Sequence, residues 1–172
     1  VFHRTTIDTD REQFHRLVRA LNRRCDILYE YNDGSVLPDT MEDPLPFDIE
    51  ADLIKVEDRD YAVWYREVSE EPQKYAGKTF KIKGMVVQAP ELSDGDFICG
   101  RQLMTCCAED MQFAGFICKY KPSQMFSTRD WVYVTAKLLF EYHDVYGQEG
   151  PVLFVEEIAR TVCPQEPIAT FY

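Results

Sequence analysis

The stretch that decides the fold is 97-FICGRQLMTCCAEDMQFAGFIC-118. Two apolar, strand-like pieces at 97–105 and 113–120 flank a short polar connection, and this pattern predicts a β-hairpin with its chemistry at one end. The stretch also holds four of the 6 cysteines of the chain, together with an arginine and two acids. We therefore expect the rest of the domain to be organised around this hairpin.

Further segments on both sides of the hairpin also have strand character. Apolar alternation bounded by turn residues predicts strands at 79–88, 97–106, 113–119, 131–141 and 152–161. Gly84 lies inside the first of them, where a barrel strand has to bend sharply. Five strands, with an insertion at 122–128 that has room for one helical turn, predict a mainly β (α+β) domain. The specific architecture that we expect is a five-stranded OB-like Greek-key barrel.

A helix is predicted to cover one open end of this barrel. It begins at Asp58, which we expect to cap it, and it ends before the Pro72 to Gly77 region. Three aromatic residues and a valine share one face of the helix: Tyr61, Trp64, Tyr65 and Val68. Such a stripe is typical of packing against a sheet, so we interpret it as part of the core.

The first 48 residues are predicted to be an N-terminal extension of the main domain. Helical spacing of apolar residues predicts an amphipathic helix at 9–24, and 26–31 alternates enough for a short strand. The acidic, proline-containing segment 35–48 is typical of a linker. We therefore place the barrel domain at 49–172, with its first residues, 49–56, left open between strand and helix.

Charge and hydropathy restrict the partners of the chain. Its 172 residues carry a formal net charge of -11, with a pI near 4.7. Nucleic-acid binders ordinarily carry a basic face, so we expect no nucleic-acid partner and favour a cation or a protein. No apolar run approaches the roughly 20 residues that cross a bilayer, so no membrane span is predicted within these residues. Because the chain begins with valine, we expect a processed piece whose signal or anchor lies upstream.

The polar connection of the hairpin is the candidate metal site. If the chain turns between the adjacent Cys106 and Cys107, both sulfurs and the Asp110 carboxylate can converge at the hairpin end. Two thiolates and one carboxylate suit zinc, which accepts both kinds of ligand in a tetrahedral shell. We therefore predict these three residues as metal ligands, with zinc as the expected cofactor.

Four other residues are candidate additions to this site. Cys99 and Cys118 lie on the two strands of the hairpin and can contribute further sulfurs. Arg101 is expected to orient the Asp110 carboxylate by a charge-assisted hydrogen bond. His143 follows the fourth strand and can reach the hairpin end as a nitrogen ligand or a base, although a solvated loop histidine is the simpler interpretation.

Other interpretations of the thiols stay open. Cys99 and Cys118 can form a disulfide across adjacent strands, the vicinal pair can cycle between dithiol and disulfide, or the thiols can be inert. Cys25 and Cys163 can pair with each other or be free. The sequence contains no glycine-rich phosphate loop, serine elbow or HExxH motif, so we predict no enzymatic activity.

Several of these segments together resemble a known family. The segments are YAGK at 75–78, KIKGMV at 81–86, FICGR at 97–101, MTCCAED at 104–110, Trp131-Val132, and a tail with Pro164, Pro167 and Tyr172. They resemble the C-terminal domain of a bacterial family of predicted two-component permease accessory subunits, a domain without an assigned biochemical function. The resemblance covers 49–172 and leaves out the first 48 residues.

The resemblance implies a soluble domain that upstream helices anchor to the membrane, outside the cytoplasm, beside a permease subunit. The genomic company of the family suggests zinc or another metal. The sequence departs from the family pattern at Glu109-Asp110-Met111 and in adding Cys99 and Cys118. We therefore expect a non-enzymatic, membrane-associated accessory domain that handles a metal ion. A thiol–disulfide redox module and an OB-type interaction scaffold with structural cysteines remain as alternatives.

Overall fold

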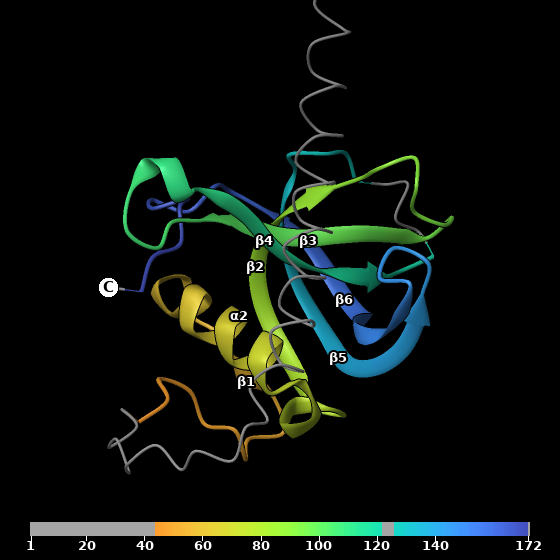
Figure 1. Cartoon of the computed structure of the whole chain (residues 1–172), viewed down its shortest axis with the longest axis horizontal. Coiled ribbons are helices and arrows are strands. Elements are labelled where there is room, and N and C mark those ends of the chain that lie inside the picture. Colours follow the sequence, from red (N-terminus) through yellow and green to blue (C-terminus); the bar gives the residue numbers. More distant parts are fainter. Residues whose placement is uncertain (1–43, 122–125, 172) are drawn as a thin grey trace, which may run out of the picture.

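The computed structural model of the chain describes residues 44–121 and 126–171, so the predicted N-terminal helix and strand lie outside the described part. This part is mainly β, with a six-stranded sheet and a single α-helix (Figure 1). The elements in chain order are β1 (Ile54–Lys55), η1 (Asp58–Asp60), α2 (Tyr61–Glu70), η2 (Pro72–Tyr75), β2 (Thr79–Val87), β3 (Asp96–Leu103), η3 (Ala108–Asp110), β4 (Gln112–Lys119), β5 (Trp131–His143) and β6 (Gln148–Thr161).

All five predicted strands are present, and the segment left open at 49–56 contributes the short strand β1, parallel to β2. The largest differences lie at the strand ends. β3 stops at Leu103, three residues before its predicted end, because the chain bends there into the hairpin connection. β5 runs on to His143 and β6 starts at Gln148, so a tight turn with Gly147 at φ 65° joins them.

Five strands of the sheet close into a ring, and β1 pairs with β2 outside it. The strand order is β1-β2-β3-β4-β6-β5, and β2 also pairs with β5. The changeover on β2 occurs at Met85, which pairs both with Trp131 of β5 and with Gly100 of β3. The neighbouring Gly84 permits this close crossing, because a Cβ atom there would lie 2.6 Å from Sγ of Cys99 on β3.

The hairpin of β3 and β4 also depends on glycine. Gly100 and Gly115 face each other across the two strands. A Cβ atom on Gly100 would lie 2.4 Å from the backbone oxygen of Ala114, and one on Gly115 would lie 2.5 Å from the backbone oxygen of Cys99. Neither position has room for a side chain, so the pair lets the two strands approach closely at the centre of the hairpin.

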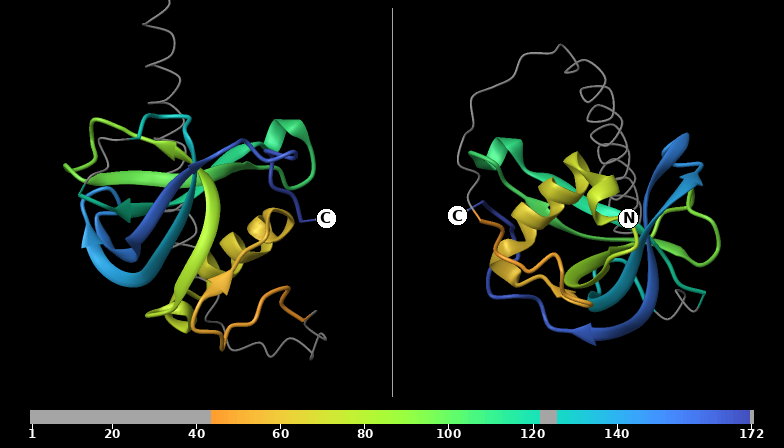
Figure 2. Two further views of the ribbon diagram at one scale, coloured as in Figure 1. Left: turned by 180° about the vertical axis from the view of Figure 1, so that it is seen from behind. Right: turned by 90° about the horizontal axis from the view of Figure 1, so that it is seen from below.

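The helix α2 lies beside β2 and the hairpin, as Figure 2 shows from two further sides. Its predicted aromatic face is buried in the main core, and Trp64 makes edge-on contacts at 5.5 Å with both Phe80 of β2 and Phe116 of β4. The core-packing prediction is confirmed. The predicted cap is wrong: the N-cap residue of α2 is Asp60, without a side-chain capping bond, and Asp58 lies in the preceding η1.

The C-terminal tail returns to the hairpin end. Ala169 forms a parallel bridge with Leu103, where its N–H donates to the Gln102 oxygen (2.8 Å) and its oxygen accepts the Met104 N–H (3.0 Å). The Phe171 ring then lies under a guanidinium of α2. The tail is therefore held by a single bridge beside the residues that lead into the connection. No helix among the described residues is long and apolar enough to span a bilayer.

Candidate metal centre

The two vicinal thiols and the acid of the hairpin connection lie together. One ligand atom from each of Cys106, Cys107 and Asp110 lies within 4.8 Å of the other two. Sγ of Cys106 is 3.8 Å from Sγ of Cys107 and 2.8 Å from Oδ2 of Asp110. The chain does turn as the sequence suggested, and the assignment of these residues as metal ligands stays a prediction.

Local hydrogen bonds produce this arrangement. After β3 the chain bends at 105–107 and then forms the single turn η3, in which the Asp110 N–H donates to the Cys107 oxygen (3.1 Å). The Thr105 hydroxyl (2.6 Å) and the Cys106 N–H (2.9 Å) both donate to Oδ2 of Asp110. The role of Thr105 was missed in the sequence, although threonine and aspartate in turns commonly form local hydrogen bonds.

The same contacts set the protonation states. The S–H of Cys106 donates to the Asp110 carboxylate, and this bond raises the pKa of Cys106 to about 11. The bonds from Cys106 and Thr105 lower the pKa of Asp110 to about 2. Near neutral pH the site therefore holds a carboxylate beside a protonated thiol. A bound metal ion would take the place of the thiol proton, which makes metal binding and proton release one process.

The cluster is accessible from solvent. Cys106 and Cys107 are both exposed, and Asp110 is half-buried. Met111, which follows, is also exposed, with 37% of its surface open. An ion can therefore reach the sulfurs without any movement of the strands.

The predicted role of Arg101 is wrong. Its side chain is 1% exposed, whereas the residues of the connection at 105–109 are exposed. Its Nε donates to the Lys83 oxygen (2.8 Å), and its terminal nitrogens donate to the backbone oxygen and the carboxylate of Asp58. Arg101 therefore orients Asp58 at the start of the helical segment, and not Asp110.

Asp58 and Arg101 form part of a charge cluster in which the cations are buried and the Asp58 carboxylate is half-exposed. Lys83 Nζ also lies 3.4 Å from the Asp58 carboxylate, and the guanidinium lies 5.1 Å from the ring of Tyr61 and 5.5 Å from that of Trp131. Burial raises the pKa of Asp58, but the hydrogen bond and charge of Arg101 outweigh it and hold that pKa below its usual range. This cluster anchors η1 and α2 to the strands.

Cys99 and Cys118 are not part of the candidate metal centre. Both are 0% exposed in the main core, on β3 and β4, and both are free thiols, so the disulfide weighed for them is not formed. Burial, with the hydrogen bond that the Cys118 thiol donates to Cys99, raises the pKa of Cys118 well above its usual range. Cys163 is exposed and free, and its suggested partner Cys25 lies outside the described residues.

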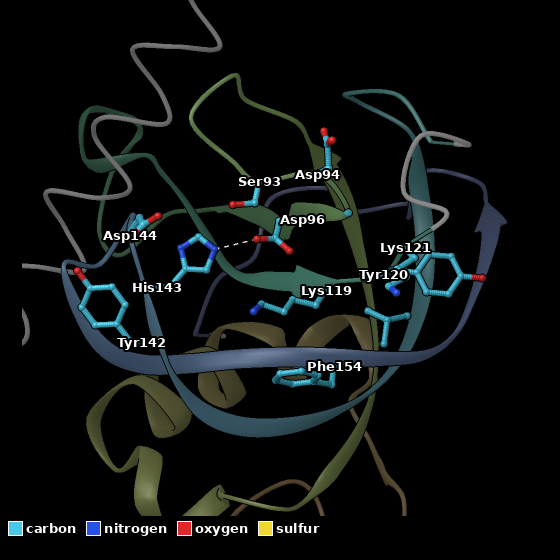
Figure 3. Close-up of a pocket in the computed structure, with 12 residues that line it drawn as sticks. Ser93, Asp94, Asp96, Lys119, Tyr120, Lys121, Tyr142, His143, Asp144 and Phe154 are labelled. Carbon is cyan, nitrogen blue, oxygen red and sulfur yellow. Dashed lines mark hydrogen bonds and ion pairs between the residues drawn. The ribbon is translucent and has the colours of Figure 1, made fainter.

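His143 lies at the opposite end of the hairpin strands and is not a solvated loop residue. It is 6% exposed, and its Nε2 is 2.9 Å from Oδ2 of Asp96, the first residue of β3 (Figure 3). The Val145 N–H donates to its Nδ1 at 3.2 Å. From Asp96 to Leu103 a strand spans roughly 23 Å, so His143 cannot join the cysteines.

This pair lies in a pocket that the sequence did not reveal. The pocket has a volume of about 680 Å³ and is lined by residues of β3, β4, β5 and β6 and by the loop before β3. Lys119 lies on one wall, paired with Glu141 at 2.6 Å. Its residues come from four separate segments, and no local pattern in the sequence joins them.

Fold and site together define a class: a mainly β domain with an exposed Cys-Cys-Asp cluster at the end of one hairpin. The family model of the DUF1980 C-terminal domain matches residues 32–169, so the chain belongs to this family. This confirms the recognition of a C-terminal domain of unknown function, and the match begins upstream of the region where the resemblance was visible.

The chain was also compared with curated proteins and with solved structures. No curated protein matches the chain. Among solved structures, yeast RPA bound to ssDNA is similar with 10% identity and a TM-score of 0.38, over 64% of this chain and 76% of that one. OBody NL8 bound to hen egg-white lysozyme is similar with 11% identity and a TM-score of 0.32, over 52% of this chain and 100% of that one.

Proposed function

We propose that this domain binds a zinc-like metal ion through Cys106, Cys107 and Asp110, as a non-enzymatic accessory domain of a membrane permease system. The observation that carries the proposal is the convergence of two thiols and one carboxylate within 4.8 Å. The membrane anchor, the extracytoplasmic side and the permease partner rest on the sequence resemblance.

The chemistry of these three donor side chains fits a zinc-like ion. Sulfur ligands favour soft or borderline ions such as zinc, and a carboxylate oxygen completes many zinc sites. The nearest cation on the same strand, Arg101, faces Asp58 on the inside and so does not oppose a bound cation. Thr105 holds Asp110 in place by its hydroxyl, as outer hydrogen bonds commonly do for metal ligands.

We also propose that the ring of strands is a Greek-key barrel of the OB type. Support comes from the closed order of β2, β3, β4, β6 and β5, and from the parallel pairing of β4 with β6 in an otherwise antiparallel ring. In this arrangement α2 covers one end. The metal cluster would then lie outside the barrel, on the connection between its second and third strands.

A metal titration tests the function. The reduced, metal-free chain is titrated with zinc, and bound metal is measured by elemental analysis after gel filtration. We expect one ion per chain, lost in both Cys106→Ser and Cys107→Ser. Cys163→Ser removes another exposed free thiol outside the cluster and serves as the matched control. Unchanged metal content in both cluster variants would refute the proposal.

A second candidate function is thiol–disulfide exchange. It is favoured by the 3.8 Å separation of the Cys106 and Cys107 sulfurs. Glutathione disulfide would oxidise the pair: the two thiols lose two protons and two electrons, their sulfurs join, and two glutathione thiols form. A loss of two hydrogens by mass, reversed by mild reductant, would support this function. If the chain neither binds metal nor forms the disulfide, the third alternative is an interaction scaffold whose cysteines are structural.

A further inference from the structure

The pocket around His143 contains a buried carboxylate whose charge is not neutralised by a cation. The side chain of Asp96 is 8% exposed, and its Oδ2 lies 2.9 Å from Nε2 of His143. Nδ1 of the same imidazole accepts the Val145 N–H at 3.2 Å, so this nitrogen carries no proton and the ring is neutral. The Nε2–H therefore donates to Asp96, and the carboxylate keeps its negative charge.

The second oxygen of this carboxylate is free. No described residue donates a hydrogen bond to Oδ1 of Asp96. Within residues 44–121 and 126–171, Trp64 Nε1 is the one fully buried side-chain nitrogen or oxygen without a partner, so Oδ1 is accessible from the pocket that Asp96 lines. Figure 3 shows this oxygen turned away from His143. Buried carboxylates are ordinarily paired with a cation, and here the position of the cation is open.

The charged side chains of the lining favour a positive ligand. Asp94 and Asp144 add two exposed carboxylates to that of Asp96. Two lysines also line the pocket, but Lys119 is already paired with Glu141 at 2.6 Å, which leaves Lys121 against three acids. The lining is therefore net negative, on a chain whose formal charge is -11.

Aromatic rings form the apolar part of the wall. Tyr120, Tyr142 and Phe154 line the pocket, and Tyr142 is 58% exposed. The ammonium of Lys119 lies 5.6 Å from the centre of the Phe154 ring, so this wall already holds one alkylammonium group against an aromatic face. The pocket volume of about 680 Å³ leaves room for a further alkyl chain.

We propose that this pocket binds an aliphatic primary amine in its ammonium form. The ammonium donates to Oδ1 of Asp96 and neutralises the buried charge, and the alkyl chain packs on the aromatic wall. Water can donate the same bond but brings no charge, so the charge of the ligand is the property to test. The same ammonium group is found on a free alkylamine and on a lysine side chain of a partner protein. The pocket lies at the opposite end of β3 from the cysteines, and its ligand does not depend on a metal ion.

An NMR titration of the full, reduced and metal-free chain tests this proposal. The probe is n-pentylamine, at about 0.15 M salt to screen diffuse attraction to the acidic chain. We expect saturable shifts of the His143 ring and of the Asp96 amide. The neutral n-pentanol has the same chain length and should bind at least about tenfold more weakly. A parallel titration with Nα-acetyl-lysine methylamide tests the lysine side chain as the source.

A matched pair of variants localises the binding. Asp96→Asn keeps an acceptor for His143 but presents an amide N–H to the pocket, so amine binding should weaken by about tenfold or more. Glu166→Gln removes an exposed carboxylate of the C-terminal tail and should leave amine binding unchanged. Circular dichroism checks that each variant folds. If Asp96→Asn does not fold, the exposed pair Asp94→Asn and Asp144→Asn should together weaken binding by about twofold to fivefold.

The outcomes separate the sources of the amine from failure of the proposal. Binding of n-pentylamine alone supports a free alkylamine, and tighter binding of the lysine derivative supports a partner's lysine. Equal binding of n-pentanol overturns the proposal, because the pocket would then not recognise charge. Binding that is unchanged in Asp96→Asn, shifts spread over the acidic surface, or no response to either amine would overturn it as well.

Discussion

Replacing Arg101 with methionine should destabilise the domain and leave metal binding intact. The variant keeps a long, flexible side chain in the core but removes the guanidinium that bonds to Asp58 and to the Lys83 oxygen. The reason for the expected loss of stability is that a half-buried carboxylate partner and a backbone oxygen each lose a donor. The metal cluster is not among the contacts of this side chain.

The magnitude follows from the exposure of the two partners. Breaking a buried ion pair costs about 3–5 kcal/mol when the remaining charge is fully buried. The side chain of Asp58 is 43% exposed and keeps Lys83 as a partner, so water and the lysine compensate part of the loss. We therefore expect the free energy of unfolding to fall by about 2–3 kcal/mol, which is at or below the lower end of that range. At this chain length the corresponding fall in Tm is about 6–9 °C.

Thermal unfolding followed by circular dichroism measures this change, and zinc stoichiometry is measured on the same samples. Arg160→Met is the matched control, because Arg160 pairs with Asp130 at 3.5 Å on the surface and is 63% exposed. The control should cost less than about 1 kcal/mol. If Arg101→Met instead melts like the wild type and loses zinc, the reasoning is wrong and Arg101 acts on the metal loop after all.

Three further predictions concern other parts of the domain. Asp110→Ala removes the acceptor that holds the thiol proton of Cys106, so the pKa of Cys106 should fall; its alkylation by iodoacetamide at pH 8, followed by peptide mass mapping, should accelerate by about tenfold or more. An unchanged rate would contradict this. Gly100→Ala would place a methyl group 2.4 Å from a backbone oxygen of β4. It should cost about 1–3 kcal/mol in urea unfolding, and a wild-type midpoint would refute the close approach. His143→Leu leaves the 8% exposed carboxylate of Asp96 without its partner and should cost about 2–3 kcal/mol, with zinc stoichiometry unchanged. Loss of zinc there would place His143 at the cluster.

The strands could be predicted because their signal is local. Alternation between apolar and polar residues, interrupted by turn residues, located β2, β4 and β5 to within two residues at each end. The end of β3 was misplaced by three residues because Thr105 and Asp110 bond to each other across the turn, and side-chain bonds of this kind leave no periodic trace.

The partner of Arg101 could not be read from local spacing. Asp110 is nine residues away, and Asp58, the true partner, is 43 residues away on the other side of the helix. Arg101 lies on the same face of β3 as Cys99 and Leu103, which are buried in the main core. A side chain buried on that face cannot reach a loop outside the ring, so alternation along the strand argues against Asp110 as its partner.

The return of the C-terminal tail to Leu103 has a practical consequence for purification. A polyhistidine tag fused after this tail would begin close to the exposed thiols, since Ala169 already bridges to the strand that leads into them. Such a tag would supply imidazoles of its own, which bind metal ions beside the cluster. Samples for metal analysis should therefore carry a cleavable tag at the N-terminal end, or a tag without histidine.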